Sequence, residues 1–218
     1  MAKKIKQNLK NDILSKYMEY VLNHGKAPES VYRFCKDSEI SEQDFYSHFG
    51  SFKGMNQSFW ETMVHNTVAV ITKDKEFMTA SLEDQLLTFY FTFFENMLAN
   101  RSYVLLVLHG NRLEDLKQLK YLRGPVIEFF KNLPDEEKYN KLNFLPESIK
   151  EISFQEASWV QMLTIIRFWL NDTSPKFEKT DALIEKSIRA ASELKNFPPM
   201  ESLLDLGKFL YHESKTIL

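Results

Sequence analysis

The stretch ISEQDFYSHF, residues 40–49, carries side chains that can read base edges in DNA. A glutamine amide can pair with adenine through two hydrogen bonds, so Gln43 is the residue best suited to base recognition. The carboxylates of Glu42 and Asp44 could accept only from cytosine, and they would repel nearby phosphates. Both acids fall in the first turn of the predicted helix, where the helix dipole favours negative charge. A stabilising role therefore explains these two acids without any ligand.

Other polar residues near this stretch could contact the DNA backbone. Ser30 and Lys53 stand at the starts of predicted helices, where a phosphate is favoured. A flexible electrostatic arm could be formed by Lys3, Lys4 and Lys6. Plainer roles are open as well, since Tyr46 could pack between helices, His48 could be a solvated surface residue and Gln43 could be exposed without a role.

Three helices are predicted to position these side chains. The first, at about residues 8–23, ends before Gly25 and buries one stripe, composed of Ile13, Leu14, Tyr17, Met18 and Val21. The second, at about residues 28–38, buries Val31, Phe34 and Cys35. Ser41 is predicted to cap the third, with Asp44 in the place of the usual Glu or Gln of a capping box.

Two short helices around a tight turn have the proportions of a helix-turn-helix, with Ile40 in the turn and Phe45 and Phe49 facing inward. The residues resemble the TetR-type transcriptional regulators. Ser30 matches the Ser or Thr that opens the family's second helix, and Ile40-Ser41 matches the Val-Ser of its turn. The remaining matches are Tyr46, Phe49, Lys53 and Gly25.

This resemblance covers residues 9–60 and, more loosely, residues 168–188. It implies that Tyr46 and His48 touch the DNA backbone and that Ser41 belongs to the DNA-binding set. Three features differ from the family pattern: Ser38-Glu39 replaces Ala-Gly, one extra residue separates Phe49 from Lys53, and the third helix opens with acids.

The rest of the chain is predicted to be helical too, because its apolar residues recur at intervals of three and four, and Pro125 is predicted to mark one of the helix edges. Residues 82–98 are apolar nearly all round, so this helix is expected at the centre of its domain. We therefore predict an all-α protein with a three-helix helix-turn-helix DNA-binding domain in residues 1–52. Residues 53–218 would form a larger helical bundle for effector binding and dimerisation.

The helices at about residues 155–170 and 180–194 carry wide apolar faces, and small residues on the second allow close approach. By resemblance to the family they would form a four-helix dimer interface. The predicted interface residues are Trp159, Leu163, Ile166, Leu170, Ile184, Ile188 and Ala191.

The aromatic helix could wall an apolar effector cavity, as it would in the family, although ordinary core packing is the simpler alternative. The predicted lining residues are Phe93, Met97, His109, Trp159, Met162 and Ile166. Phe and Met walls favour an uncharged or weakly charged, largely apolar small molecule. The helix after Lys53, which carries Trp60, would pivot when the effector binds and so release DNA.

Composition narrows the classes of protein. Residues 1–60 hold nine basic and seven acidic side chains, a net +2, and the remainder carries −4, which suits a small polyanion-binding segment on a larger one. The single cysteine, Cys35, excludes an intrachain disulfide, and no apolar run is long enough to span a bilayer. We expect a cytoplasmic protein.

Catalytic and cofactor motifs are missing from the sequence, which has no P-loop, GxGxxG, HExxH or GxSxG. Glu61 and His65 have helical i,i+4 spacing, but two ligands make a weak metal site. We expect no enzyme activity, no metal and no cofactor. The predicted function is a homodimeric, ligand-responsive repressor on a near-palindromic DNA operator. The alternative is a TetR-like helical protein that binds a lipid or a protein partner without binding DNA.

Overall fold

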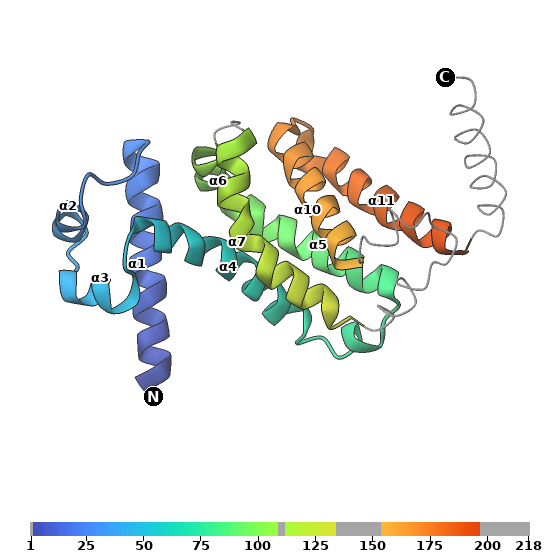
Figure 1. Ribbon diagram of the computed structural model, residues 1–218, viewed down its shortest axis with the longest axis horizontal. Coiled ribbons are helices and arrows are strands. Elements are labelled where there is room, and N and C mark those ends of the chain that lie inside the picture. Colours follow the sequence, from blue (N-terminus) through green and yellow to red (C-terminus); the bar gives the residue numbers. More distant parts are fainter. Residues whose placement is uncertain (1, 109–111, 134–153, 197–218) are drawn as a thin grey trace, which may run out of the picture. The chain divides into compact units, whose positions relative to one another are not determined.

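A computed structural model of the chain describes residues 2–108, 112–133 and 154–196, and the side chains of residues 8–108, 114–133 and 154–190. Within these ranges the chain forms helices and loops and no strand, so the predicted all-α fold is confirmed (Figure 1). The elements are α1 (Ala2–His24), α2 (Val31–Asp37), α3 (Glu42–His48), α4 (Phe52–Ile71), η1 (Phe77–Thr79), α5 (Leu82–Ala99), α6 (Arg101–Val107), α7 (Arg112–Lys131), α10 (Phe154–Asn171), η2 (Pro175–Phe177) and α11 (Glu178–Asn196).

Contacts divide the chain into two compact units. The first comprises Met1–Ala69 with Phe93–Pro125, and the second comprises Val70–Thr92 with Val126–Leu218. The helices α5 and α7 therefore contribute one part to each unit. The predicted boundary between residues 52 and 53 separates a DNA-binding part from an effector-binding part, which a division by contacts does not test. It stays a prediction.

An aromatic cluster holds the amino-terminal helices of the first unit together. The ring of Phe34 on α2 makes edge contacts with Tyr17, Phe45 and Phe52, at centroid distances of 5.9, 6.0 and 5.9 Å. Tyr17 in turn stacks on Phe52 at 5.3 Å. Because one ring from each of α1, α2, α3 and α4 enters this cluster, the contacts between the rings hold these four helices together.

Helix α1 is longer than predicted and changes one expectation. It begins at Ala2 rather than near residue 8, because no proline or glycine interrupts the Lys- and Leu-rich start. Lys3, Lys4 and Lys6 therefore lie on the helix, and the prediction of a flexible arm is wrong. At the other end Gly25 adopts φ +67° and donates from its N–H to the Val21 carbonyl at 2.8 Å, so the predicted stop is confirmed.

Core predictions for the amino-terminal helices are largely confirmed. Ile13, Leu14, Tyr17 and Val21 are buried on α1, whereas Met18 is half-buried. On α2 the side chains of Phe34 and Cys35 are buried, but Val31 is only half-buried, since it occupies the first helical position.

The second unit is built around stacked aromatic rings. Phe89 of α5 lies 4.3 Å from Phe129 of α7 at an interplanar angle of 16°, and Phe130 makes an edge contact with Phe154 of α10 at 6.0 Å. Pro125 was a predicted helix edge, but it lies inside α7, so that prediction is wrong. Among the described helices none is both long and apolar enough to cross a bilayer.

A buried carboxylate fixes the corner between α10 and α11. Asp172 accepts hydrogen bonds from the N–H and hydroxyl of Ser174 at 2.8 and 2.6 Å, and from the N–H and hydroxyl of Thr180 at 3.0 and 2.7 Å. Burial alone would raise the pKa of Asp172, but these four bonds outweigh it and hold the pKa below its ordinary value. The corner also places Lys176 and Phe177 at φ +54° and +60°, where non-glycine residues are strained.

Candidate functional site

Helix α3 presents an exposed polar face above a buried aromatic one. Phe45 is fully buried and Phe49 nearly so, and these two rings anchor the helix against the first unit's core. Gln43 is exposed, and Tyr46 keeps 55% of its surface exposed, so Tyr46 is not packed between helices. His48 is half-buried. Gln43 and Tyr46 are thus accessible on this helix, His48 is partly so, and their contact with DNA stays a prediction.

The acid at residue 44 is tied back to its own helix. Ser41 accepts from the Asp44 N–H at 3.0 Å, and its hydroxyl donates to the Asp44 carboxylate at 2.6 Å, so the predicted capping role is confirmed. This arrangement satisfies an N–H of the first turn and holds the negative charge close to the helix start. It also commits the Ser41 hydroxyl proton, which leaves Ser41 poorly suited to donate to a phosphate.

Ser30 is arranged differently from Ser41. Its Oγ accepts from the Arg33 N–H at 3.1 Å and so caps α2, but no acceptor for its hydroxyl proton is present among the described residues. A capping serine in this state can still donate outward to an anion. Lys53 is exposed in the first turn of α4, where a side chain can reach a backbone phosphate.

The turn between α2 and α3 carries a strained residue. Glu39 adopts φ +54°, and the next residue, Ile40, donates its N–H to the Cys35 carbonyl at 2.9 Å. This is the position where the resemblance places glycine, which adopts such a backbone without strain. The turn therefore keeps its shape even though the chain has Glu here.

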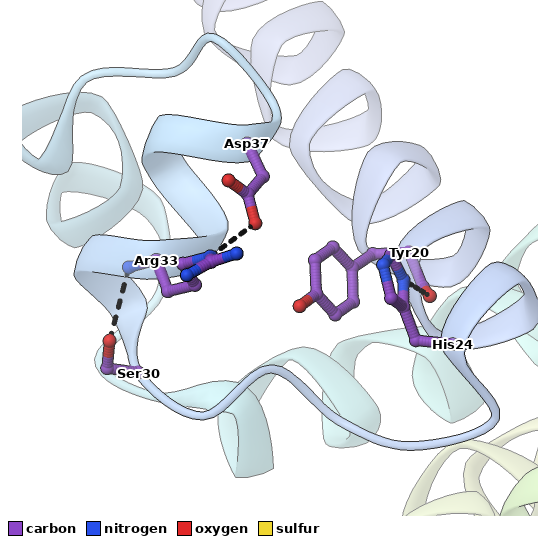
Figure 2. Close-up of polar contacts among 5 residues, drawn as sticks. All are labelled: Tyr20, His24, Ser30, Arg33 and Asp37. Atoms are coloured by element: carbon purple, nitrogen blue, oxygen red, sulfur yellow. Dashed lines mark hydrogen bonds and ion pairs between the residues drawn. The ribbon is translucent and has the colours of Figure 1, made fainter.

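A cluster of charged and aromatic side chains lies between α1 and α2, and it was not predicted from the sequence. Figure 2 shows Arg33 paired with Asp37 on α2, with the ring of Tyr20 on α1 pointing toward the arginine. His24 stacks on Tyr20 at 4.0 Å, and its Nδ1 lies 2.8 Å from the Tyr20 carbonyl oxygen. An arginine at i and an aspartate at i+4 could have indicated the pair, but the tyrosine comes from another helix and gives no local signal.

The predicted effector residues are buried, in two different units. Phe93 and Met97 belong to the first unit, and Trp159, Met162 and Ile166 belong to the second. His109 lies outside the described residues. Burial of this kind fits a cavity wall and a packed core equally, so the effector site stays a prediction.

The predicted dimer residues are placed mostly inside the chain. Trp159, Ile166, Ile184 and Ile188 are each at most 9% exposed, whereas Leu163 and Leu170 are half-buried. Ala191 lies on α11, and its side chain is outside the described set. The exposed apolar side chains of α10 are Val160 at 60% and Phe168 at 40%, and neither is among the predicted interface residues. They are eight residues apart and lie on one face, because two helical turns separate them.

A polar atom without a partner lies on α4. The Trp60 side chain is fully buried, and its Nε1–H has no acceptor among the described residues. Such unpaired buried donors are uncommon in folded proteins. The sequence showed only that Trp60 lies on the helix after Lys53, so the absence of a hydrogen-bond acceptor for its Nε1–H in the part of the chain that the structure describes could not be predicted.

Comparison with known proteins gives one match and one absence. The family model described as "Tetracyclin repressor-like, C-terminal domain" matches residues 85–210, more than half of the chain. No curated protein matches the chain. The matched segment begins inside α5, includes α11 and leaves out the helix-turn-helix, so it supports the family through a part of the chain different from residues 9–60. With its all-helical fold and amino-terminal helix-turn-helix, the chain belongs to the TetR family of transcriptional regulators.

Proposed function

We propose that the protein is a ligand-responsive repressor that binds a near-palindromic DNA operator as a homodimer. Proteins of this family generally bind DNA, dimerise and bind small ligands. The observation that carries the proposal for this chain is the exposed face of α3, where Gln43 and Tyr46 stand free above the anchored rings of Phe45 and Phe49. A helix anchored in this way can enter a major groove without disturbing its own core.

In this proposal Gln43 reads a base edge and Lys53 contacts a phosphate. Replacing Gln43 by Ala should blur recognition at one base position and cost about 1 to 3 kcal/mol on that site alone. Replacing Lys53 by Ala should weaken binding to all sequences alike and lower the salt dependence. Equal losses on specific and random DNA for both variants would contradict this division of roles.

The experiment that tests the proposal is an electrophoretic shift on the DNA flanking the protein's own gene, with competition by random DNA. A specific complex at nanomolar protein is expected. The rival function, a TetR-like protein that binds a lipid or protein partner without DNA, is favoured by the carboxylate of Glu42 on the exposed face. The capping of Asp44 weakens this rival, because only one of the two acids then faces outward freely.

We propose further that the effector is a largely apolar small molecule that releases DNA through a movement of α4. A hundredfold loss of operator affinity would need about 2.7 kcal/mol of differential binding between the two states. Trp60 can report a movement of α4 through its fluorescence, because the surroundings of its buried Nε1–H would change when the helix moves. Screening an apolar compound library by Trp60 fluorescence, in a variant with Trp159 and Trp169 replaced by Phe, would identify candidate effectors.

A further inference from the structure

The arginine of α2 is held by one nitrogen only. Arg33 donates from Nε to Oδ2 of Asp37 at 2.8 Å, while 61% of the Arg33 side chain and 34% of the Asp37 side chain remain exposed. Among the described residues the terminal amines, Nη1 and Nη2, have no hydrogen-bond partner. A hydrogen bond through Nε restricts the orientation of the guanidinium, and the outer edge formed by Nη1 and Nη2 points in a different direction from the Nε–H, where it can meet a second acceptor.

The residues around Arg33 come from α1 and from the start and end of α2. Tyr20 on α1 points its ring toward Arg33, and Ser30 lies one turn before it with a free hydroxyl proton (Figure 2). The other charged groups near Arg33 are Asp37 and Glu29, both on or beside α2. The cluster thus combines a fixed guanidinium with one hydroxyl donor on the same short helix.

We propose that Arg33 binds a DNA backbone phosphate through Nη1 and Nη2, and that Asp37 is the positioning residue that orients it. This inference rests on the proposed function, since it adds a contact to the same DNA interface. Paired amines of a guanidinium match two phosphate oxygens, and a lysine cannot reproduce that geometry. The occupant is a phosphate of duplex DNA because Ser30, at the start of α2, is already predicted to meet the backbone.

Whether a substitution at Asp37 weakens or tightens DNA binding distinguishes this proposal from charge repulsion alone. Asp37→Asn removes a negative charge beside a polyanion, so charge repulsion alone predicts tighter DNA binding. If Asp37 orients Arg33, the same change instead weakens binding several-fold, because the amide oxygen of Asn accepts from Nε more weakly than a carboxylate and holds the guanidinium less firmly. Glu39→Gln is the matched control, since it removes an exposed acid that holds no arginine, and it should leave binding unchanged or tighter.

The measurement is fluorescence anisotropy of the full chain with a 30-base-pair duplex, titrated at several salt concentrations. Arg33→Gln should weaken operator and random DNA alike by about tenfold and reduce the slope of log affinity against log salt by about one. Arg33→Lys should recover the slope but not the full affinity, because it restores only the charge. On the Arg33→Gln background, Asp37→Asn should cause no further loss.

Circular dichroism melting of each variant guards against loss of folding. If Arg33→Gln is folded and binds DNA with unchanged affinity and slope, or if Asp37→Asn tightens binding as much as Glu39→Gln does, the inference is overturned and the proposed function stands. If the wild-type chain binds neither operator nor random DNA at low salt, the proposed function itself fails.

Discussion

Tyr103 on α6 donates its hydroxyl to Oδ1 of Asn56 on α4, at 2.9 Å. Tyr103 is 1% exposed, and burial raises the pKa of its hydroxyl above the ordinary value of 10.0. Within the first unit this bond links α4, which carries Lys53 in its first turn, to a helix 47 residues further along the chain. The bond lies beside the ring contact between Phe59 and Tyr103, and a movement of α4 relative to α6 would have to break or bend it.

Removing that link should destabilise the first unit. Tyr103→Phe deletes the hydroxyl and leaves the half-buried Asn56 without its donor, which should lower the free energy of unfolding by about 1 kcal/mol. Urea unfolding would measure the change, with Tyr32→Phe as the control because Tyr32 is 62% exposed. A variant as stable as the wild type would show that the bond contributes nothing.

The strained turn between α2 and α3 should be improved by glycine. Glu39→Gly relieves a left-handed residue and should raise the free energy of unfolding by roughly 1 kcal/mol. Glu19→Gly, in the interior of α1, is the matched control and should lower it by a similar amount. If both substitutions destabilise the protein, the left-handed backbone at Glu39 is wrong.

The corner at Asp172 should make the second unit sensitive to acid. The folded state holds the pKa of Asp172 below its ordinary value of 3.8, so its stabilising contribution is complete well above that value and is lost progressively as the pH falls from it toward the lower pKa of the folded state. Asp172→Asn should cost about 2 kcal/mol at pH 7 and flatten the fall in stability below pH 4. Unfolding curves between pH 7 and pH 3 test this, and Glu185→Gln on the exposed face of α11 should leave them unchanged.

The buried tyrosines should make the protein sensitive to alkali. Burial raises the pKa of Tyr17 to about 12, and it raises the pKa values of Tyr90 and Tyr103 as well. The unfolded chain loses these protons near pH 10, so stability should be complete below pH 10 and should decrease as the pH rises toward 12. Thermal melting at pH 9 and pH 11 measures this, and Tyr17→Phe should reduce the decrease. An equal decrease in that variant would show that Tyr17 does not titrate as described.

The exposed residues of α10 should control assembly. Val160 and Phe168 are the exposed large apolar residues on this helix, so Phe168→Glu should turn a dimer into a folded monomer. Met78→Glu is the control, because Met78 is 60% exposed and lies on η1 rather than on α10. Sedimentation velocity at micromolar concentration distinguishes the states, and a wild-type monomer would contradict the dimer prediction.

Local patterns were enough to predict the amino-terminal helices and their caps. The Ser41–Asp44 cap, the stop at Gly25 and the burial of Phe34 and Phe45 each depend on residues within one or two turns, so the sequence carries the signal directly. The start of α1 was misplaced because a run of charged good helix formers has no apolar stripe to mark it. Pro125 was misread because a proline can be accommodated inside a helix when the surrounding structure holds it.

Hydrogen bonds between residues far apart in the chain could not be predicted from the sequence. The Tyr103–Asn56 bond spans 47 residues, and the Tyr90 hydroxyl lies 3.2 Å from the Ser158 carbonyl across 68 residues. The sequence could not separate the faces of α10, on which Trp159 and Ile166 are buried within the chain, because an apolar helix has no polar stripe to orient it. Only the packing inside the chain shows that Val160 and Phe168 are the exposed members.

DNA binding by the exposed face of α3 is the central claim, and one titration tests it most directly. Anisotropy of the wild-type chain would be measured against the DNA flanking its gene and against a scrambled duplex of equal length, alongside Gln43→Ala. We predict a specific complex that is at least about a thousandfold tighter than the scrambled one, and a selective loss for the variant. Equal affinity for the two duplexes, unchanged by Gln43→Ala, would contradict the account.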